Sequence, residues 1–281
     1  MQGINFTISH KFIKDGCVVG AVCLMQNGGT VFLRKVNFRA FFSKNKCLNA
    51  KLSANDSLLS LSDGIPELEL SGNKRVLFHG SKFGIQGGIA PNKSRVACDF
   101  GLGFYTGTSE KQARERIVDE SNGIFYSVYA DMSNLNVYTF KNMRDWCFFV
   151  GVNRGFIKLH DIPKFEETFN RIKSSDVIVG DIADDTMQSV FPDFLIGNIT
   201  DVALQKCLMC ANLGTQYVFK TAKACSSITI LGKERWDERK RLFMKSEQRK
   251  SLAAIERKVD IVKQQNRRYG KFIDELKEEY K

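Results

Sequence analysis

Hydrophobic and polar positions near the start of the chain form three short β-like runs. "INFTISHKFI", "CVVGAVCLM" and "TVFLRKVNFRAFF" are rich in β-branched and aromatic residues. Asp15-Gly16 and the stretch "QNGG" separate these runs, and Asp-Gly and Asn-Gly favour hairpin turns because such residues accept positive φ. The pattern predicts a three-stranded meander followed by a Ser- and Asn-rich connector, which together make a β-rich unit over residues 1–72.

From residue 73 to residue 231, short apolar runs alternate with stretches whose apolar residues recur every three or four positions. The first pattern is typical of strands and the second of helices, so this region is expected to form a compact α+β domain. Strands are predicted in "RVLFH", "GFYTG", "GIFYSVYA", "LNVYTF", "SDVIVG", "TQYVFKT" and "SSITILG". Helices are predicted around residues 109–120, where Ser109 and Gln112 have capping-box spacing, and around 144–155, 183–190 and 200–212.

The remaining residues, 232–281, form a basic amphipathic tail. From residue 233 onward it contains 16 Lys or Arg against 10 Asp or Glu, and its apolar residues recur at helical spacing. The pattern predicts one long helix or a helix pair. A helix packed on the core or on a partner protein is the favoured interpretation, and a nucleic-acid-binding arm is the alternative.

Composition limits the class of protein further. The chain has 281 residues, is 43% hydrophobic and contains four prolines, as expected for a globular protein. It lacks an apolar run of about 20 residues, so no membrane association and a cytoplasmic location are expected. Its eight cysteines are expected to be reduced, and Cys207 and Cys210 to be buried helical residues without a metal. The net charge of +11 indicates an anionic partner.

Three stretches of the central region combine residues that suit a nucleotide ligand. "LFHGS" ends a predicted strand in His79, Gly80 and Ser81, which offer an imidazole, close approach to the backbone and a hydroxyl. "DFGLGFYTG" places an aromatic pair after two glycines, and one of its rings can present a flat face to a heteroaromatic ligand. Gln216 opens the predicted strand "TQYVF", where its amide can bind a sugar hydroxyl.

In this order and spacing, "LFHGS", "GGIAP", "DFGLGFYTGTSEKQA" and "TQYVF" resemble the ADP-ribosyltransferase superfamily of the diphtheria-toxin and poly(ADP-ribose) polymerase type, in particular a bacterial toxin-like branch. The resemblance covers residues 74–231. It implies an α+β core of two packed antiparallel sheets with helices, carrying the N-terminal β-rich unit and the long C-terminal helix. It also implies NAD+ as co-substrate and no metal.

The resemblance assigns roles to single residues. His79 would bind the adenosine ribose of NAD+, and Tyr105 would stack on the nicotinamide ring and take part in catalysis. The residues that would contact NAD+ are His79, Gly80, Ser81, Gly103, Phe104 and Tyr105. Gln216 stands where many relatives carry a catalytic glutamate, and this is where the chain departs from the family pattern.

The departure matters because cleavage of the nicotinamide–ribose bond develops positive charge, which a carboxylate stabilises and an amide does not. Poly-chain elongation is therefore not expected, and mono-ADP-ribosylation or no activity is. Asp181, Asp184 and Asp185, just after a predicted strand, are candidates for the missing acid. The alternative is that Asp184 and Asp185 only cap a helix.

Two classes of function remain open. The first is a mono-ADP-ribosyltransferase toxin of a defence or toxin–antitoxin system, whose acceptor is RNA, single-stranded DNA or protein. Nucleic acid is slightly favoured because the N-terminal runs interleave aromatic and basic residues, namely Phe6, Phe12, Phe32, Phe38, Phe41 and Phe42 with Lys35 and Arg39. The second is an inactive module that binds NAD+ or ADP-ribose. The C-terminal helix is a possible docking segment for a neutralising antitoxin protein.

Overall fold

The computed structural model describes residues 6–14, 17–26, 29–38, 69–70, 73–94, 97–182, 190–211 and 213–281. The chain divides into two compact units, residues 1–76 and residues 77–281. The predicted boundary after residue 72 lies close to this division. The candidate site lies in the second unit.

The N-terminal unit contains the predicted meander. Its strands are β1 (Phe6–Lys14), β2 (Cys17–Gln26) and β3 (Gly29–Phe38), which pair antiparallel in the order β1-β2-β3. The predicted turn at Asp15-Gly16 lies outside the described residues. In the connector, the two-residue strand β4 (Glu69–Leu70) pairs antiparallel with β5 (Lys74–Ser81), through Arg75 and Lys74.

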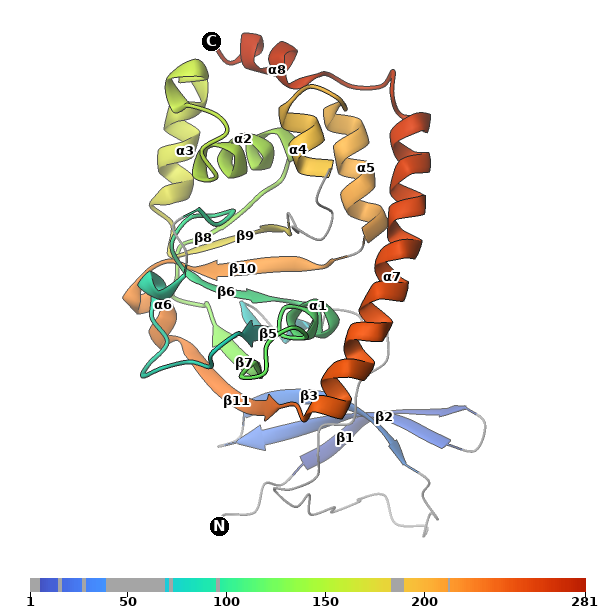
Figure 1. Cartoon of the computed structure of the whole chain (residues 1–281). Coiled ribbons are helices and arrows are strands. Elements are labelled where there is room, and N and C mark those ends of the chain that lie inside the picture. Colours follow the sequence, from blue (N-terminus) through green and yellow to red (C-terminus); the bar gives the residue numbers. More distant parts are fainter. Residues whose placement is uncertain are drawn as a thin grey trace. The chain divides into compact units, whose positions relative to one another are not determined.

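One mixed sheet forms the centre of the larger unit (Figure 1). Seven strands follow one another in the order β11-β7-β5-β6-β10-β9-β8, with β4 beside β5. The strands are β5 (Lys74–Ser81), β6 (Phe104–Gly107), β7 (Ile124–Asp131), β8 (Val137–Thr139), β9 (Val177–Asp181), β10 (Thr215–Phe219) and β11 (Ile228–Arg235). All seven predicted strands of this region are therefore present.

The sheet corrects the expectation of two packed antiparallel sheets. A single register pair, Phe78 with Gly107, joins β5 to β6, whereas four pairs join β6 to β10. The two expected sheets are thus halves of one sheet that share a narrow seam. The pair β8 and β9 is parallel, because a crossover containing two helices connects these strands and lets both run in the same direction.

Eight α-helices are described around this sheet, and they are α1 (Glu110–Glu115), α2 (Met143–Asn153), α3 (Glu166–Lys173), α4 (Val190–Leu195), α5 (Asp201–Ala211), α6 (Ala222–Ser226), α7 (Glu238–Gln265) and α8 (Ile273–Glu279). The Ser109 hydroxyl accepts from the Gln112 backbone, as the capping motif predicts, but α1 ends at residue 115 rather than 120. The helix expected around 183–190 falls mostly outside the described residues, and α4 begins at its end. Neither α3 nor α6 was predicted.

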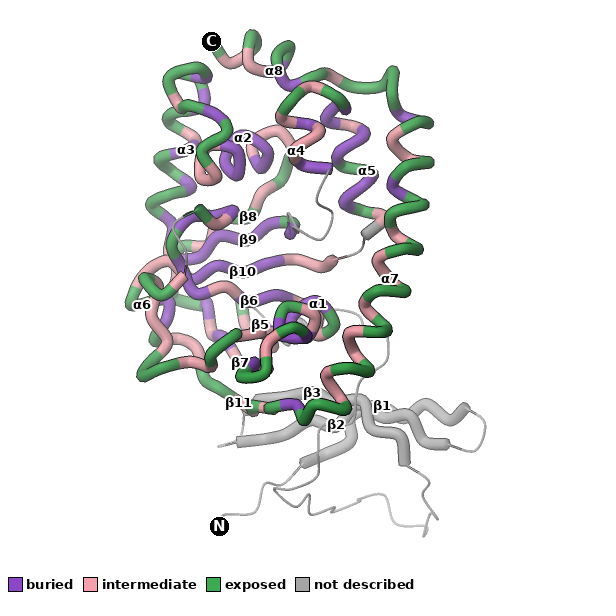
Figure 2. Tube along the Cα trace, in the orientation of Figure 1, coloured by how far each residue is buried: buried purple, intermediate pink, exposed green. Residues whose placement is uncertain are grey.

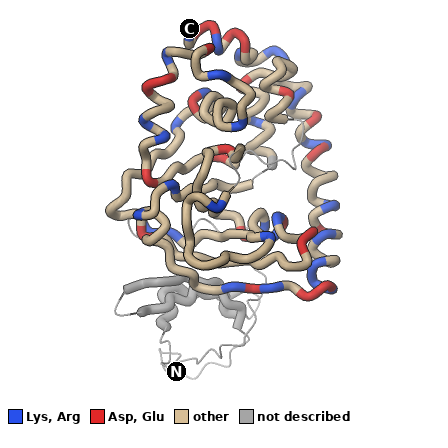
Figure 3. Tube along the Cα trace, turned by 60° about the vertical axis from the view of Figure 1, so that its left-hand side comes forward, with Lys and Arg blue, Asp and Glu red and all other residues tan. Residues whose placement is uncertain are grey.

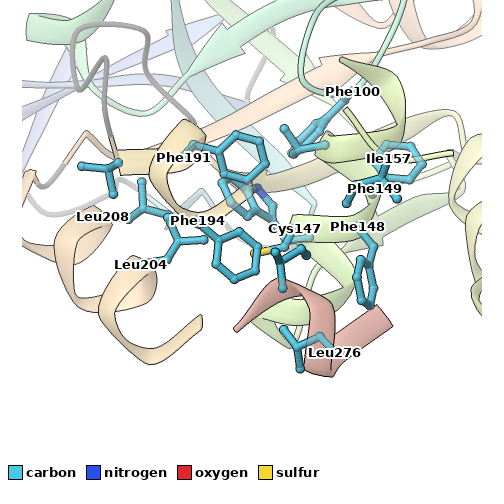
Figure 4. Close-up of a cluster of buried hydrophobic side chains, with 14 of the residues drawn as sticks. Phe100, Cys147, Phe148, Phe149, Ile157, Phe191, Phe194, Leu204, Leu208 and Leu276 are labelled. Carbon is cyan, nitrogen blue, oxygen red and sulfur yellow. The ribbon is translucent and has the colours of Figure 1, made fainter. Parts of the chain in front are cut away.

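The two faces of the sheet bury separate hydrophobic cores. The larger core lies among α2, α3, α4, α5, α7 and α8 and includes Phe100, Phe148 and Phe194 (Figure 4). Along β10, Val218 faces this core, whereas Tyr217 and Phe219 face the second one. Because successive side chains of a strand point to opposite faces, an unbroken apolar run such as "YVF" marks a strand covered on both sides.

The C-terminal tail is part of the folded unit. Val259 of α7 and both Ile273 and Leu276 of α8 are buried in the larger core, while the outer side of α7 is exposed (Figure 2). The predicted boundary between residues 231 and 232 falls inside β11. The tail therefore follows the favoured interpretation of a helix packed on the core, and it does not begin where the sequence pattern changes.

Candidate functional site

The fold brings the three sequence motifs together on adjacent strands. His79 lies near the end of β5, Tyr105 lies in β6, and Gln216 lies at the start of β10, and these are neighbours in the sheet order. The motifs are separated by 26 and 111 positions in the sequence. Their convergence is thus produced by the topology, which places the strand of Tyr105 between the other two.

His79 is held by the backbone of the second motif. Its Nδ1 lies 2.6 Å from the carbonyl oxygen of Tyr105, and its ring lies 4.5 Å from the ring of Phe104, centroid to centroid. Burial lowers the pKa of the imidazole to about 4. At neutral pH the ring is therefore uncharged, and Nδ1 carries the hydrogen because a carbonyl oxygen can only accept. Nε2 is left as a hydrogen-bond acceptor.

Gly80 is required by the packing of α1. A Cβ at this position would lie 2.1 Å from the carbonyl oxygen of Ala113, far inside van der Waals contact. Ser109 caps the helix N-terminus and fixes where α1 begins. Ser81, partly buried, ends β5 directly after this contact. The histidine–glycine motif thus also places a helix against the strand.

The aromatic pair divides between the two faces of the sheet. Phe104 is buried in the second core, and the half-buried Tyr105 packs against the larger core. The Tyr105 hydroxyl donates to the Gly101 carbonyl at 2.6 Å and accepts from the Phe100 amide at 3.0 Å. Burial raises the pKa of this hydroxyl far above its usual range. The tyrosine therefore braces the glycine-containing loop that precedes its own strand.

Two further glycines shape this loop. Gly101 has φ +75°, a conformation that side-chain-bearing residues rarely adopt. Gly103 donates its backbone N–H to the Ser94 hydroxyl at 3.1 Å, and a Cβ there would lie 2.4 Å from Cγ1 of Val218. The predicted contact residue Gly103 therefore has a packing reason to be glycine.

Gln216 is buried, and only 5% of its surface is exposed. Its Nε2 donates to Oδ2 of Asp99 at 3.2 Å and to the backbone oxygen of Asp181 at 2.9 Å. Asp99 in turn accepts from Nε of Arg154 at 2.8 Å and lies 2.5 Å from a second guanidinium nitrogen. The Asp99 carboxylate therefore lies next to the Gln216 amide.

Neither Asp99 nor Arg154 was predicted as a site residue from the sequence. Asp99 immediately precedes the Phe-Gly-Leu-Gly motif in "ACDFGLG", and this adjacency is the signal that could have identified it. Arg154 is the C-cap residue of α2 and carries no comparable signal, because only the tertiary fold brings that helix end to the loop.

The side chains of His79 and Gln216 lie on opposite faces of the sheet. Gln216 and Phe78 are both in register with Gly107, so their side chains share a face, and His79, one residue beyond Phe78, points to the other. The two site residues consequently do not touch. Tyr105 connects them, since its carbonyl binds the histidine while its ring lies on the face of the glutamine.

The acidic residues proposed as alternatives are placed as follows. Asp184 and Asp185 lie outside the described residues. Asp181 pairs in register with Thr215, so its carboxylate points to the face opposite Gln216, and desolvation raises the pKa of that carboxyl. Its backbone oxygen alone contacts the site, where it accepts from both Gln216 and Trp146.

Several other predicted features lie apart from this cluster. The side chains of the N-terminal strands are not described, and Arg39, Phe41 and Phe42 lie outside the described residues. On α5, Cys207 is buried and Cys210 partly buried, and both are free thiols.

A groove of about 560 Å³ lies between α5 and α7 and is lined by Lys206, Met209, Cys210, Val262, Gln265, Asn266 and Tyr269.

The described residues contain neither a candidate metal-binding cluster nor a helix that could span a membrane. No cluster of three or more His, Cys, Asp or Glu residues capable of holding a metal ion is found among them. Likewise, none of the helices in this part of the chain is both long and apolar enough to cross a membrane.

The fold and the site define an α+β protein with a histidine, tyrosine and glutamine motif on three adjacent strands of a mixed sheet. Residues 75–230, more than half of the chain, match the family described as "Protein of unknown function (DUF3990)", and the chain belongs to this family. The match begins in β5 and ends in β11, so it contains all three motif strands. Neither a curated protein nor a solved structure matches the chain.

Proposed function

We propose that this protein is a mono-ADP-ribosyltransferase that uses NAD+. The observation that carries the proposal is the adjacency of β5, β6 and β10, which bear the three motifs that resemble those of ADP-ribosyltransferases. In this proposal NAD+ binds at the narrow seam between β5 and β6. Where only one register pair joins two strands, less backbone hydrogen bonding has to be disturbed to admit a ligand.

The residues present fit a ligand with two ribose groups. Ribose hydroxyls donate hydrogen bonds, and the neutral His79 offers an acceptor at Nε2 on one face of the sheet. Gln216 offers its amide oxygen on the other face, since both hydrogens of its nitrogen are already used. In this proposal His79 binds the adenosine ribose and Gln216 binds the nicotinamide ribose, with Tyr105 beside the nicotinamide.

NAD+ would supply an activated ADP-ribosyl group. The bond between ribose and nicotinamide breaks, nicotinamide leaves with the electron pair, and a nucleophile of the acceptor bonds to the ribose carbon and loses its proton. The chain's own residues hold the ribose hydroxyls and exclude water from the buried side of Gln216. The amide at this position favours a single transfer over chain elongation.

The charge distribution favours a nucleic acid as the acceptor. Lys and Arg are interspersed with Asp and Glu along the described chain (Figure 3). Along α7 and the following turn, however, six exposed cations form no ion pair within the described part of the chain, and they are Arg239, Arg249, Arg257, Lys258, Arg267 and Arg268. Such cations are available to neutralise phosphates.

A second candidate function is an NAD+- or ADP-ribose-binding module without transferase activity. It is favoured by the neutral side chain of Gln216, because an uncharged amide stabilises developing positive charge less than a carboxylate does. The two candidate functions differ in one product: the transferase releases free nicotinamide, and the binding module does not.

The test is an assay of nicotinamide release and label transfer. Purified protein is incubated with NAD+ labelled separately in the nicotinamide and adenine parts, with RNA, single-stranded DNA or cell-extract protein as acceptor. We expect release of nicotinamide together with adenine label on one acceptor class. His79→Ala and Gln216→Ala should each lower the rate at least about tenfold, because each removes a contact to the reacting dinucleotide.

The exposed His160, which lies beside Asp161, provides the matched control, and His160→Ala should leave the rate unchanged. Binding of NAD+ without any release of nicotinamide would favour the binding module. Neither binding nor release would contradict both candidates.

A further inference from the structure

The buried carboxylate of Asp99 is the feature of the molecule that sequence motifs do not explain. Asp99 is 9% exposed, lies in the loop braced by Tyr105, and forms a two-point ion pair with Arg154 at the end of α2. Arg154 alone would suffice as a partner for a structural aspartate. The second oxygen of Asp99 instead contacts Gln216, the residue at which the chain departs from the ADP-ribosyltransferase pattern that its motifs resemble.

The surroundings of Gln216 determine how its amide is oriented. Both neighbours of its nitrogen, the Asp99 carboxylate and the Asp181 carbonyl, are acceptors only. The NH₂ group must therefore face them, and the amide oxygen must point the other way. Within the described part of the chain this oxygen forms no hydrogen bond.

We infer that Asp99 is a positioning residue that fixes the Gln216 amide with its oxygen toward the ligand and makes that oxygen a stronger acceptor. A hydrogen bond from the amide nitrogen to a carboxylate is charge-assisted, and it shifts electron density toward the amide oxygen. Asp99 and Gln216 would then bind the ribose hydroxyl as a pair, a task that a single glutamate performs in the ADP-ribosyltransferases that the motifs resemble. The role rests on the proposed function, whereas the pairing itself does not.

The loop is built to keep Asp99 in place. Tyr105 holds the loop through the Phe100 amide and the Gly101 carbonyl, and Lys220 donates to the Phe100 carbonyl at 2.6 Å. Arg154 binds Oδ1 of Asp99, the oxygen that does not contact Gln216. These contacts hold both the loop backbone next to Asp99 and the carboxylate itself, as a residue that orients another requires.

The first test moves the carboxylate from residue 99 to residue 216 and the amide from 216 to 99, and it measures the unfolding midpoint of each variant. Gln216→Glu places a second carboxylate beside Asp99, so the pKa of one of the two is raised above its value in the unfolded chain. A carboxyl group whose pKa is higher in the folded than in the unfolded protein lowers the stability of the fold as pH rises, because the unfolded state loses the proton first. We expect the Gln216→Glu unfolding midpoint to fall further below that of the wild type at pH 8 than at pH 5. Asp99→Asn/Gln216→Glu should remove this extra pH-dependent loss.

The second test is turnover at saturating NAD+. Asp99→Asn should lower the rate of nicotinamide release about 10- to 100-fold with little change in KM, the usual loss when a residue that orients a reacting group is removed. The exchanged double variant should recover part of the rate. Asp193→Asn is the matched control and should keep the wild-type rate, because it removes a carboxylate of α4 that pairs with Lys263 of α7, away from Gln216.

Two results would overturn the inference. One is a Gln216→Glu variant whose stability follows that of the wild type at both pH values. The other is an Asp99→Asn variant that releases nicotinamide as fast as Asp193→Asn. If the wild type releases no nicotinamide with any acceptor, the proposed function fails, and the stability exchange still decides whether Asp99 holds Gln216.

Discussion

At the scale of single residues, the site is built from side chains that each also hold the fold together. Gly80 admits α1, Tyr105 braces the preceding loop, and His79 bonds to the backbone of the neighbouring strand. For this reason a residue-by-residue interpretation of the sequence favours structural roles. The functional interpretation depends on how these residues are combined.

The partly buried His79 makes stability depend on pH. Its pKa is about 4 in the folded protein and about 6.5 in an unfolded chain, so the unfolded state binds more protons between these values. Stability should therefore fall as pH decreases from 6.5 to 4, by up to about 3 kcal/mol from this group. Urea unfolding of the wild type and of His79→Asn across this range measures the contribution, and the wild type should lose up to about 3 kcal/mol more stability than the variant between pH 6.5 and pH 4. Parallel curves would contradict it.

Gly80 gives a steric prediction. Gly80→Ala should destabilise the protein by roughly 1–3 kcal/mol, because the added methyl meets the rigid α1 backbone at Ala113. Gly88→Ala is the matched control, since a Cβ there meets nothing within 4 Å. Thermal unfolding compares the two, and equal midpoints would show that α1 does not pack on Gly80.

At the scale of elements, local patterns predicted the strands well and the helices less completely. β6, β9 and β10 have apolar runs bounded by glycine or polar residues, and all three formed as expected. α3 was missed because its apolar side consists only of Phe169 and Ile172 on an otherwise polar and charged helix. The single mixed sheet could not be predicted either, since the one pair between β5 and β6 is a long-range contact without a local signal.

The C-terminal helices are expected to be essential for stability. Leu276→Ala in α8 should cost about 2–5 kcal/mol, because this side chain is fully buried in the larger core. Ile261→Ala in α7, where 54% of the residue is exposed, should cost less than about 1 kcal/mol. Chemical unfolding measures both. A chain truncated at residue 232 that kept wild-type stability would contradict this description of the tail.

At the scale of the whole molecule, the positive charge is distributed unevenly along the chain. The net charge is +11, and the tail contributes 6 of these charges. Their location on α7 could be foreseen from the helical pattern. The partner of Gln216 could not be, because Asp99 lies 117 positions away and meets it only after the sheet forms.

The exposed cations of α7 should govern binding to nucleic acid. Arg239→Gln/Arg249→Gln/Arg257→Gln should weaken binding to single-stranded RNA and make its dependence on salt less steep, because fewer counterions are released. The control variant removes three exposed lysines elsewhere and so changes the net charge by the same amount as the α7 variant. These lysines are Lys164, Lys173 and Lys223. Equal effects of the two triple variants in a fluorescence titration would show that only net charge matters.

The most direct test of the account is a hydrogen-exchange footprint of NAD+ on the full chain. Bound NAD+ should slow amide exchange in residues 79–85 and 97–107, which flank the seam between β5 and β6, and leave the groove between α5 and α7 unchanged. The His79→Ala variant should lose this protection. Protection confined to α5 and α7, or none at saturating NAD+, would contradict the assignment of the site to the three motif strands.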